Sequence, residues 1–165
     1  MIALDKSAQL LDIARARLGE QVQWVRHDLT EPLHWLPDRS VDHVLMALVI
    51  HYLEDPVPAL REIHRVLRDT GSVVLSTHHP ASDWHRLGGS YFADEMYDDT
   101  WSTGWVMRYR RRPLQTITSE FTQAGFRIDE LVEPRPAQAM LTSSPRTYER
   151  LRQEPGFISF RLTKR

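Results

Sequence analysis

The sequence predicts an α/β fold, a mostly parallel sheet with helices on both faces. Two observations carry this prediction. In the first half, short apolar runs alternate with amphipathic stretches, which is the pattern of βα units. The run Val41 to Leu48 is nearly continuous in apolar residues, as expected of a strand covered on both faces. With 165 residues, 41% of them hydrophobic, the chain has the size and apolar content of one domain with its own core.

The first 25 residues predict a strand, a helix and a second strand. Ile2 to Leu4 has the composition of a buried strand, and Val22 to Val25 that of the next one. Between them, Ser7 is expected to cap a helix that Gly19 ends. One face of this helix is predicted to be buried, and it carries Leu10, Leu11, Ala14 and Leu18.

The next βα unit follows from residues 41–75. We expect the strand from Val41 to Leu48 to be a central one. Asp55 and Pro56 then supply a helix cap and a first-turn proline. The buried stripe of this helix comprises Ala59, Leu60, Ile63, Val66 and Leu67, and Gly71 precedes a strand at Val73 to Leu75.

The second half is less regular. Residues 78–113 show no sustained period and are rich in aromatic side chains, so we interpret them as a cap or lid insertion. A helix is predicted from Leu114 until Gly125, followed by a strand from Phe126 to Val132. A proline-containing loop then leads to a last strand, Phe157 to Phe160, and the two strands are expected to form an antiparallel hairpin at one edge of the sheet.

The net charge and the composition of the chain limit the kinds of partner that it is expected to bind. The 21 basic and 22 acidic side chains nearly cancel, which argues against a chain drawn to nucleic acid or to a membrane and favours a small-molecule partner. No apolar stretch approaches the roughly 20 residues of a membrane helix. The sequence has no cysteine, which excludes disulfides and thiolate zinc sites and permits a reducing compartment, so a cytoplasmic location is expected.

Several segments, taken in order, carry a family resemblance. They are Ala3–Ser7, with its strand-end Asp5; Asp28, after the second strand; Ser40–Val44; and Arg65–Gly71, with Ala124–Phe126 further on. Their order and spacing resemble the class I, Rossmann-like S-adenosylmethionine-dependent methyltransferases that act on small molecules. The resemblance covers nearly the whole chain. It implies methyl transfer from S-adenosylmethionine to a small-molecule acceptor.

The resemblance also implies a cofactor site. Asp5 is expected to hold the ribose, because one carboxylate can accept both hydroxyls of a diol. Asp28 and Leu29 are expected beside the adenine ring, with Lys6 or Ala47 lining the pocket. The alternative for a strand-end Asp is a purely structural role, in which the carboxylate caps the following turn.

Catalysis by this family depends mainly on alignment, because methyl transfer from a sulfonium is an in-line displacement. A base is needed only where the acceptor holds a proton, and His51, at the end of a strand, is the predicted catalytic residue. His78, Tyr91 and Trp101 are the predicted contacts to the acceptor. For the histidines the alternative is a hydrogen-bonded structural role, and for the aromatic residues plain packing of the cap.

Two other clusters are interpreted as structural. His78, His79, Asp83 and His85 have a spacing that enforces no metal geometry, so no metal site is predicted. The arginines around Tyr109 could clamp an anionic acceptor, but a solvated basic face is the preferred interpretation for Arg108, Arg110, Arg111 and Arg112.

The sequence departs from the family at its start. The first strand and first helices of the family have no counterpart, and no glycine precedes Asp5. We therefore interpret residues 1–165 as one N-terminally incomplete methyltransferase domain, whose true start lies upstream. A homo-oligomer is compatible with this interpretation, because a partner chain can pair with strands left open. The alternative function is a catalytically inactive, methyltransferase-like scaffold that binds a partner.

Overall fold

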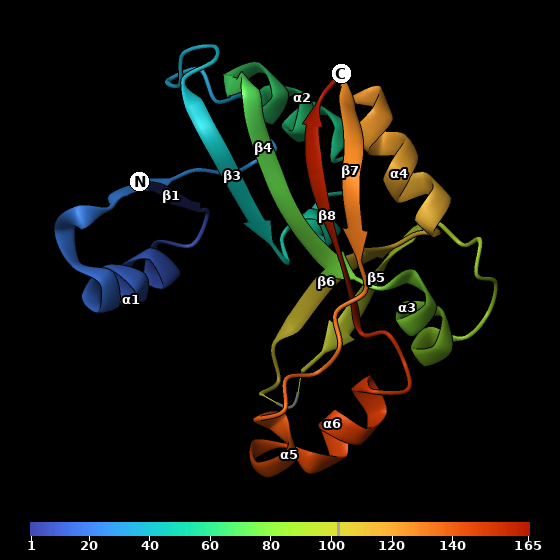
Figure 1. The fold of residues 1–165 in the computed structure, drawn as a ribbon. Coiled ribbons are helices and arrows are strands. Elements are labelled where there is room, and N and C mark those ends of the chain that lie inside the picture. The colour runs from blue at the N-terminus through green and yellow to red at the C-terminus, as the bar shows by residue number, and fades with distance from the viewer. Residues whose placement is uncertain (102) are drawn as a thin grey trace. The chain divides into compact units, whose positions relative to one another are not determined.

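The computed structural model describes residues 1–101 and 103–165, which form two compact units, Met1–Trp35 and Leu36–Arg165. The N-terminal unit is a βαβ arrangement of β1 (Ile2–Asp5), α1 (Ala8–Leu18), the short 3-10 helix η1 (Gly19–Gln21) and β2 (Gln23–Arg26) (Figure 1). Its two strands pair in parallel. The predicted cap is confirmed, because Ser7 Oγ accepts a hydrogen bond of 3.2 Å from the Leu10 backbone N–H. Gly19 ends α1 with a φ of 70°, as expected.

The predicted burial of this unit is wrong in part. Leu11 is buried, but Leu10 and Leu18 of the expected apolar face are 54% and 56% exposed, and Ile2 of β1 is 38% exposed. The reason is that a sheet of two strands offers little surface on which a helix face can be covered. Periodicity correctly predicts the helix, but it does not determine whether the apolar face is buried.

The C-terminal unit is built on a four-stranded sheet. Its strands lie in the order β3 (Val41–Ala47), β4 (Leu67–His78), β8 (Phe157–Lys164) and β7 (Phe126–Val132) (Figure 1). β3 and β4 are parallel, whereas β8 runs antiparallel to both of its neighbours. The predicted hairpin of β7 and β8 is confirmed. β8 nevertheless lies inside the sheet, and β7 forms the edge.

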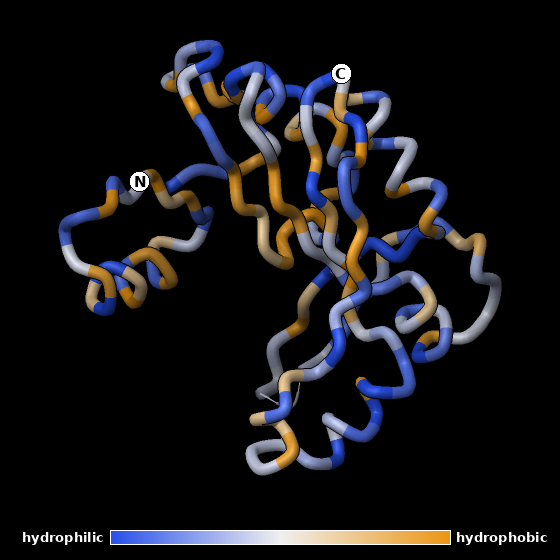
Figure 2. The backbone as a smooth tube through the Cα atoms, viewed as in Figure 1, coloured by the Kyte–Doolittle hydropathy of each residue, from blue (hydrophilic) through white to orange (hydrophobic). Residues whose placement is uncertain are grey.

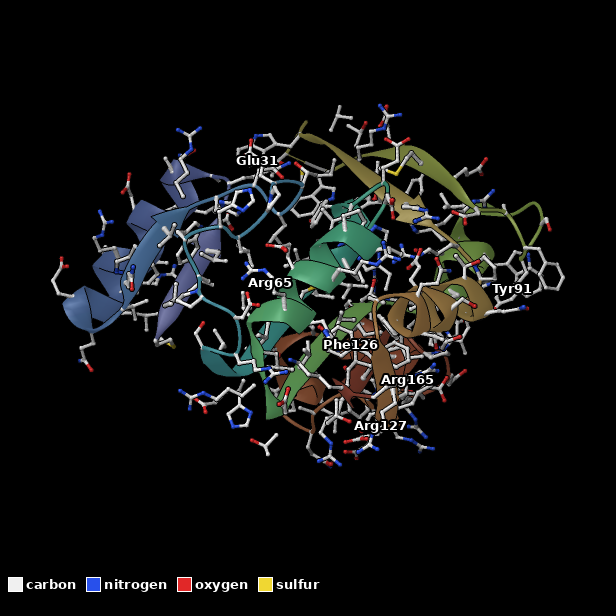
Figure 3. The ribbon with its side chains drawn as sticks, turned by 90° about the horizontal axis from the view of Figure 1, so that it is seen from above. Glu31, Arg65, Tyr91, Phe126, Arg127 and Arg165 are labelled. Atoms are coloured by element: carbon white, nitrogen blue, oxygen red, sulfur yellow. The ribbon has the colours of Figure 1, made fainter. Side chains whose placement is uncertain are left out.

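Helices α2 (Val57–Val66) and α4 (Leu114–Gln123) pack against one face of this sheet (Figure 3). Leu60 and Ile63 of the predicted stripe are buried, and the Asp55 carboxylate accepts from the Val57 N–H at 3.1 Å. Phe121 of α4 meets Phe160 of β8 edge to face, with ring centroids 5.0 Å apart. The core of the unit therefore lies between these two helices and the sheet.

The opposite face of the same sheet carries apolar side chains that remain exposed. Hydrophobic residues run along the lower parts of β3 and β4 (Figure 2). Leu45 of β3 lies opposite Val74 of β4 in the ladder, and these side chains are 76% and 45% exposed. The prediction that Val41 to Leu48 is a central strand covered on both faces is wrong, since β3 is an edge strand in this sheet. An apolar run indicates that a strand can be buried, but it does not indicate which strands or helices cover it.

Residues 78–113 are more ordered than their sequence indicates. They contain α3 (Pro80–Leu87) and a hairpin of β5 (Glu95–Thr100) and β6 (Val106–Arg111). The predicted loop after Glu133 likewise contains two short helices, α5 (Met140–Ser143) and α6 (Pro145–Leu151). The sequence did not predict the hairpin, because charged side chains lie on both of its faces and no regular alternation of apolar and polar residues marks its strands. Within the residues described, every helix is too short or too polar to cross a lipid bilayer.

Candidate active site

A tight connection after β3 brings a histidine to the carboxyl end of the sheet. Leu48 adopts a left-handed conformation with a φ of 55°, and its N–H donates to the Ser76 carbonyl of β4 at 3.1 Å. The short 3-10 helix η2 (Ile50–Tyr52) follows and buries His51, which is only 2% exposed. His51 Nδ1 lies 3.1 Å from Thr77 Oγ1 of β4. His51 is therefore fixed where open α/β sheets bind their ligands.

His51 belongs to a compact group of rings. It stacks on His78, with centroids 4.2 Å apart, and Tyr109 of β6 lies 5.4 Å from each of the two imidazoles. Tyr52 and Tyr97 contact Tyr109 at 5.1 and 5.7 Å. We call these five side chains the histidine–tyrosine cluster. They come from η2, the end of β4 and the hairpin, so they bring together segments far apart in sequence.

Burial keeps this cluster uncharged. Burial, assisted by the charges of His78 and Arg112, lowers the pKa of His51 to about 3. Burial also lowers the pKa of His78, although Asp83 opposes the change. Burial raises the pKa of Tyr52 to about 12 and also raises the pKa of Tyr97. At neutral pH the cluster therefore offers neutral imidazoles, which can accept hydrogen bonds, and phenols, which can donate them.

Asp83 lies beside the cluster and is 8% exposed. Its carboxylate is 3.7 Å from His78 Nδ1 and 3.9 Å from Arg86 Nη2. Burial raises the pKa of Asp83, while His78 and Arg86 act in the opposite direction. Burial thus favours the uncharged forms of both Asp83 and His78, and either group becomes easier to ionise when the other does.

The other histidines of this segment have separate partners. His79 Nε2 lies 2.8 Å from Glu133 Oε1, and its Nδ1 accepts from the Ala81 N–H at the start of α3. His85 lies 3.7 Å from Glu154. Among the described residues, no group of three or more His, Asp or Glu side chains has an arrangement suited to a metal ion.

The predicted cofactor residues of the N-terminal unit follow the ends of two parallel strands. Asp5 Oδ1 accepts from the Ser7 N–H at 2.8 Å, and the Asp5 carbonyl accepts from the His27 N–H at 3.1 Å. Asp28 Oδ1 accepts from both the N–H and the hydroxyl of Thr30. Both aspartates therefore cap turns, as the structural alternative requires. For either residue, no described group donates a hydrogen bond to the Oδ2 atom.

Asp28 is held ionised. The hydrogen bonds from the backbone and side chain of Thr30 lower its pKa, and the positive charge of Lys6 acts in the same direction. Lys6 is itself held near β2, because its carbonyl accepts from Arg26 Nε at 3.2 Å. The structure thus brings Asp5, Lys6 and Asp28 together at one edge of the N-terminal unit, with Leu29 next in sequence. Ala47, the fifth predicted residue, ends β3 in the C-terminal unit.

The fold around these residues is a known one. Residues 1–75 match the family described as a methyltransferase domain. Over 99% of the chain the structure matches an S-adenosylmethionine-dependent methyltransferase from Mesorhizobium loti, with 25% identity, a TM-score of 0.74 and 80% of that protein covered. The chain has the fold of the class I S-adenosylmethionine-dependent methyltransferases, and the family match identifies it as a methyltransferase. The methyltransferase shares this fold with more distant proteins as well.

One of these is an S-adenosylmethionine-dependent methyltransferase from Listeria monocytogenes, with a TM-score of 0.83 and 20% identity; the match covers 99% of this methyltransferase and 79% of that protein. Another is the 1,6-didemethyltoxoflavin-N1-methyltransferase of Burkholderia thailandensis, whose structure contains 1,6-didemethyltoxoflavin and S-adenosylhomocysteine. It has a TM-score of 0.64 and 16% identity, and the match covers 99% of this chain and 60% of that one. No curated protein matches the sequence.

The methyltransferase does not gather all of its predicted acceptor contacts. His78 joins His51 in the cluster, but Tyr91 and Trp101 lie elsewhere. Tyr91, labelled in Figure 3, is on the loop between α3 and β5 and accepts from the Leu114 N–H at 3.2 Å. Trp101 lies in the turn of the hairpin, where its N–H donates to the Trp105 carbonyl at 2.8 Å, and it is 47% exposed.

Three tyrosines of the cluster were missed by sequence reasoning. Tyr97 and Tyr109 lie directly opposite each other in the ladder of β5 and β6. Tyr109 contacts both histidines, and Tyr97 contacts Tyr109. A signal was present, because Val106, Arg108 and Arg110 alternate with Met107, Tyr109 and Arg111. The dense positive charge of this segment concealed that alternation.

The same arginines do not form a solvated face, and that interpretation is wrong for most of them. The side chains of Arg110, Arg111 and Arg112 are 16%, 14% and 2% exposed, whereas only Arg108 is largely exposed, at 70%. The physical reason is pairing. Glu120 of α4 accepts from Arg110 Nη1 at 2.9 Å and from Arg112 Nε at 3.0 Å, so one carboxylate compensates two buried guanidinium groups.

Proposed function

We propose that this methyltransferase moves a methyl group from S-adenosylmethionine to a small-molecule acceptor with an ionisable oxygen or nitrogen. The observation that supports this most is the stacked pair of His51 and His78, which burial keeps neutral at the carboxyl ends of β3 and β4. A neutral imidazole can accept a proton or a hydrogen bond from such an acceptor. A cytoplasmic reaction agrees with a sequence that has no cysteine.

The N-terminal unit has groups that fit the nucleoside part of the cofactor. Oδ1 of Asp5 and Oδ1 of Asp28 are each fixed by hydrogen bonds within the chain, which leaves each Oδ2 able to accept from a ligand. Asp5 would accept from the two ribose hydroxyls, and Asp28 from the exocyclic amine of adenine, with Lys6 and Leu29 beside it. When bound, S-adenosylmethionine supplies an electrophilic methyl group on a sulfonium.

Proton removal from the acceptor is assigned to the histidine pair. His78 is the more exposed of the two, with 26% of its side chain accessible, and the Asp83 carboxylate 3.7 Å away would stabilise it as a cation. His51, the predicted catalytic residue, is kept neutral by burial and suits the role of a hydrogen-bond acceptor that orients the acceptor molecule. Tyr109 of the hairpin packs against both imidazoles. This contact supports the proposal that residues 78–113 form a cap over the histidine pair.

Calorimetry with S-adenosylmethionine tests the first part of this proposal. We expect Asp5→Asn to weaken binding about 10- to 100-fold, because a carboxylate that accepts two hydroxyl hydrogen bonds is replaced by a neutral amide. Asp12→Asn is the matched control, since Asp12 lies on α1 with 73% of its side chain exposed and should bind like the parent chain. A parent chain that binds no S-adenosylmethionine would contradict the proposal and would favour an inactive scaffold.

A further inference from the structure

Arg86 of α3 fixes the direction in which a phenol can donate. Its Nη2 donates to the Tyr97 hydroxyl oxygen at 2.7 Å, and its Nη1 donates to Asp99 Oδ2 at 3.0 Å. The guanidinium carbon lies 5.3 Å from the centre of the Tyr97 ring. A guanidinium group has donors only, so the Tyr97 oxygen is the acceptor in this contact. The single hydroxyl hydrogen of Tyr97 is therefore left for another acceptor.

Asp83 is the acceptor that meets this hydroxyl. Asp83 Oδ1 is 3.9 Å from the same Arg86 Nη2 that contacts Tyr97. Burial raises the pKa of Asp83, whereas the charges of His78 and Arg86 and a hydrogen bond from Tyr97 lower it. A hydrogen bond donated to a carboxylate stabilises its ionised form. Tyr97 therefore favours the anion of a carboxyl group that burial favours in its protonated form.

The Asp83 carboxylate faces one particular nitrogen of His78. Nδ1 of His78 lies 3.7 Å from Asp83 Oδ1, which is longer than a hydrogen bond but close enough for a strong electrostatic effect in a buried site. An ionised Asp83 favours a proton on this nearer nitrogen. A protonated Asp83 would instead donate toward Nδ1 and place the imidazole proton on Nε2. The ionisation of Asp83 thus determines which nitrogen of neutral His78 has the lone pair.

Other charged and titratable groups surround this pair, and they come from four elements. They are Arg86 of α3, Tyr97 and Asp99 of β5, His51 of η2, and Tyr109 and Arg111 of β6. Arg86 lowers the pKa of His78 and Asp99 raises it, so these two charges oppose each other. Among the described residues, Asp83 is the only carboxylate that pairs with a His78 nitrogen. Asp83 is therefore the group that can distinguish the two nitrogens.

We propose that Tyr97 is a positioning residue, which, held by Arg86, keeps Asp83 as a carboxylate beside Nδ1 and so leaves Nε2 of His78 free to take a proton from the methyl acceptor. The catalytic part of this inference rests on the proposed methyl transfer. The proton that leaves the acceptor oxygen or nitrogen ends on Nε2, and the resulting cation faces the Asp83 carboxylate. The electron pair of the acceptor forms the bond to the methyl carbon, while the carbon–sulfur bond breaks and its electron pair stays on sulfur.

Nitrogen-15 NMR of histidine-labelled protein measures the tautomer of His78 directly. The sequence has eight histidines, and a His78→Gln spectrum identifies the signals of this one by their loss. Burial lowers the pKa of His78, so the imidazole can be observed in its neutral form at neutral pH. We expect the parent chain to carry the proton on Nδ1 and Tyr97→Phe to move the population toward Nε2. Tyr148→Phe removes a hydroxyl from α6, outside the cluster, and should leave the tautomer unchanged.

Two further variants address the same arrangement from other positions. Asp83→Asn removes the negative charge and should also move the proton of His78 toward Nε2. Asp98→Asn is its matched control, since Asp98 lies on β5 with 63% of its side chain exposed. Arg86→Met removes the donor to Tyr97 from a side chain that is 43% exposed, and it should shift the tautomer in the same direction as Tyr97→Phe.

The kinetic counterpart is a change in kcat without a matching change in KM. Tyr97→Phe keeps the ring that contacts Tyr109 and should lower kcat about tenfold for an acceptor that must lose a proton. KM should stay within about twofold, because Tyr97 acts through Asp83 and not on the bound acceptor.

A parent chain with the His78 proton on Nε2, or a Tyr97→Phe variant with an unchanged tautomer, would overturn this inference. A shifted tautomer with an unchanged kcat would overturn the role of Tyr97 in catalysis. The NMR readout needs neither S-adenosylmethionine nor turnover. A failure of the proposed methyl transfer would therefore be seen separately, as absent cofactor binding in calorimetry with the tautomer change intact.

Discussion

His51 and His78 stack face to face, with ring centroids 4.2 Å apart and planes inclined by 13°. Two imidazolium ions at this separation would repel each other strongly, particularly in a buried site. The pair can therefore hold at most one proton beyond its neutral state at accessible pH. This relationship governs the pH dependence of both stability and catalysis.

The stability of the chain should fall as the pH drops below about 6.5. The folded-state pKa of His51 is about 3, so above pH 6.5 the residue is neutral in both states and its contribution is fully present. Between pH 6.5 and 3 only the unfolded chain takes up the proton, which costs at most about 1.4 kcal/mol per pH unit. Urea denaturation at pH 7 and pH 4.5 measures the loss, and His51→Gln should reduce it. An unchanged pH dependence in that variant would contradict the assignment.

Removing His78 should slow catalysis in a way that depends on the acceptor. We expect His78→Ala to lower kcat about 10²- to 10³-fold for an acceptor that must lose a proton, because the positioned base is gone. The loss should shrink for acceptors that are already ionised at the assay pH. Rates across a series of acceptors of decreasing pKa give the measurement, with His85→Ala, 75% exposed, as the control. An equal loss for every acceptor would indicate a structural role.

Glu120→Gln should destabilise the C-terminal unit strongly. The change leaves two largely buried guanidinium groups, those of Arg110 and Arg112, without their shared carboxylate. We expect a loss of about 3–5 kcal/mol in the free energy of unfolding. Glu130→Gln is the matched control: its pair with Arg161 lies on the surface, where such contacts are worth about 1 kcal/mol or less. Similar losses in the two variants would show that Arg110 and Arg112 find other compensation.

Phe121→Ala should test the core between α4 and the sheet. Phe121 is fully buried and packs edge to face against Phe160, so its truncation should cost about 3–5 kcal/mol. Phe92→Ala removes the same ring from a position that is 77% exposed and should change stability by less than about 0.5 kcal/mol. Chemical denaturation of both variants gives the comparison, and a small loss for Phe121 would mean that the neighbouring side chains collapse into the space.

Local patterns predicted the regular elements well. The stripe of α2 is buried as its period required, and β7 has the predicted bounds, because each element carries a signal within its own sequence. In the hairpin of β5 and β6 the signal is weak, since Arg110 and Arg111, which pair with Asp94 and Glu95, place charges where apolar residues would mark a strand. Its two strands can be recognised only through the partners that they meet.

The candidate site was predictable to a similar extent. His51 and His78 follow the ends of predicted strands, and an α/β sheet places such positions at one edge, so their proximity could be expected. The tyrosines could not be expected, because Tyr109 reaches the histidines through a hairpin that the sequence conceals. The role of Arg112 was likewise hidden. A run of arginines does not indicate which of them will be buried and paired with a glutamate distant in sequence, as Arg112 is with Glu120.

The position of β8 between β4 and β7 determines when this sheet can be completed. A polypeptide synthesised from its amino end makes β3, β4 and β7 first, and β8 emerges last of the four strands. Until then β4 and β7 have no partner between them, and Phe126 and Leu75, which the finished sheet buries completely, remain accessible to water. A nascent chain of this kind gains both pairings of β8 in one late step, and before that step its open strand edges are the part most exposed to aggregation.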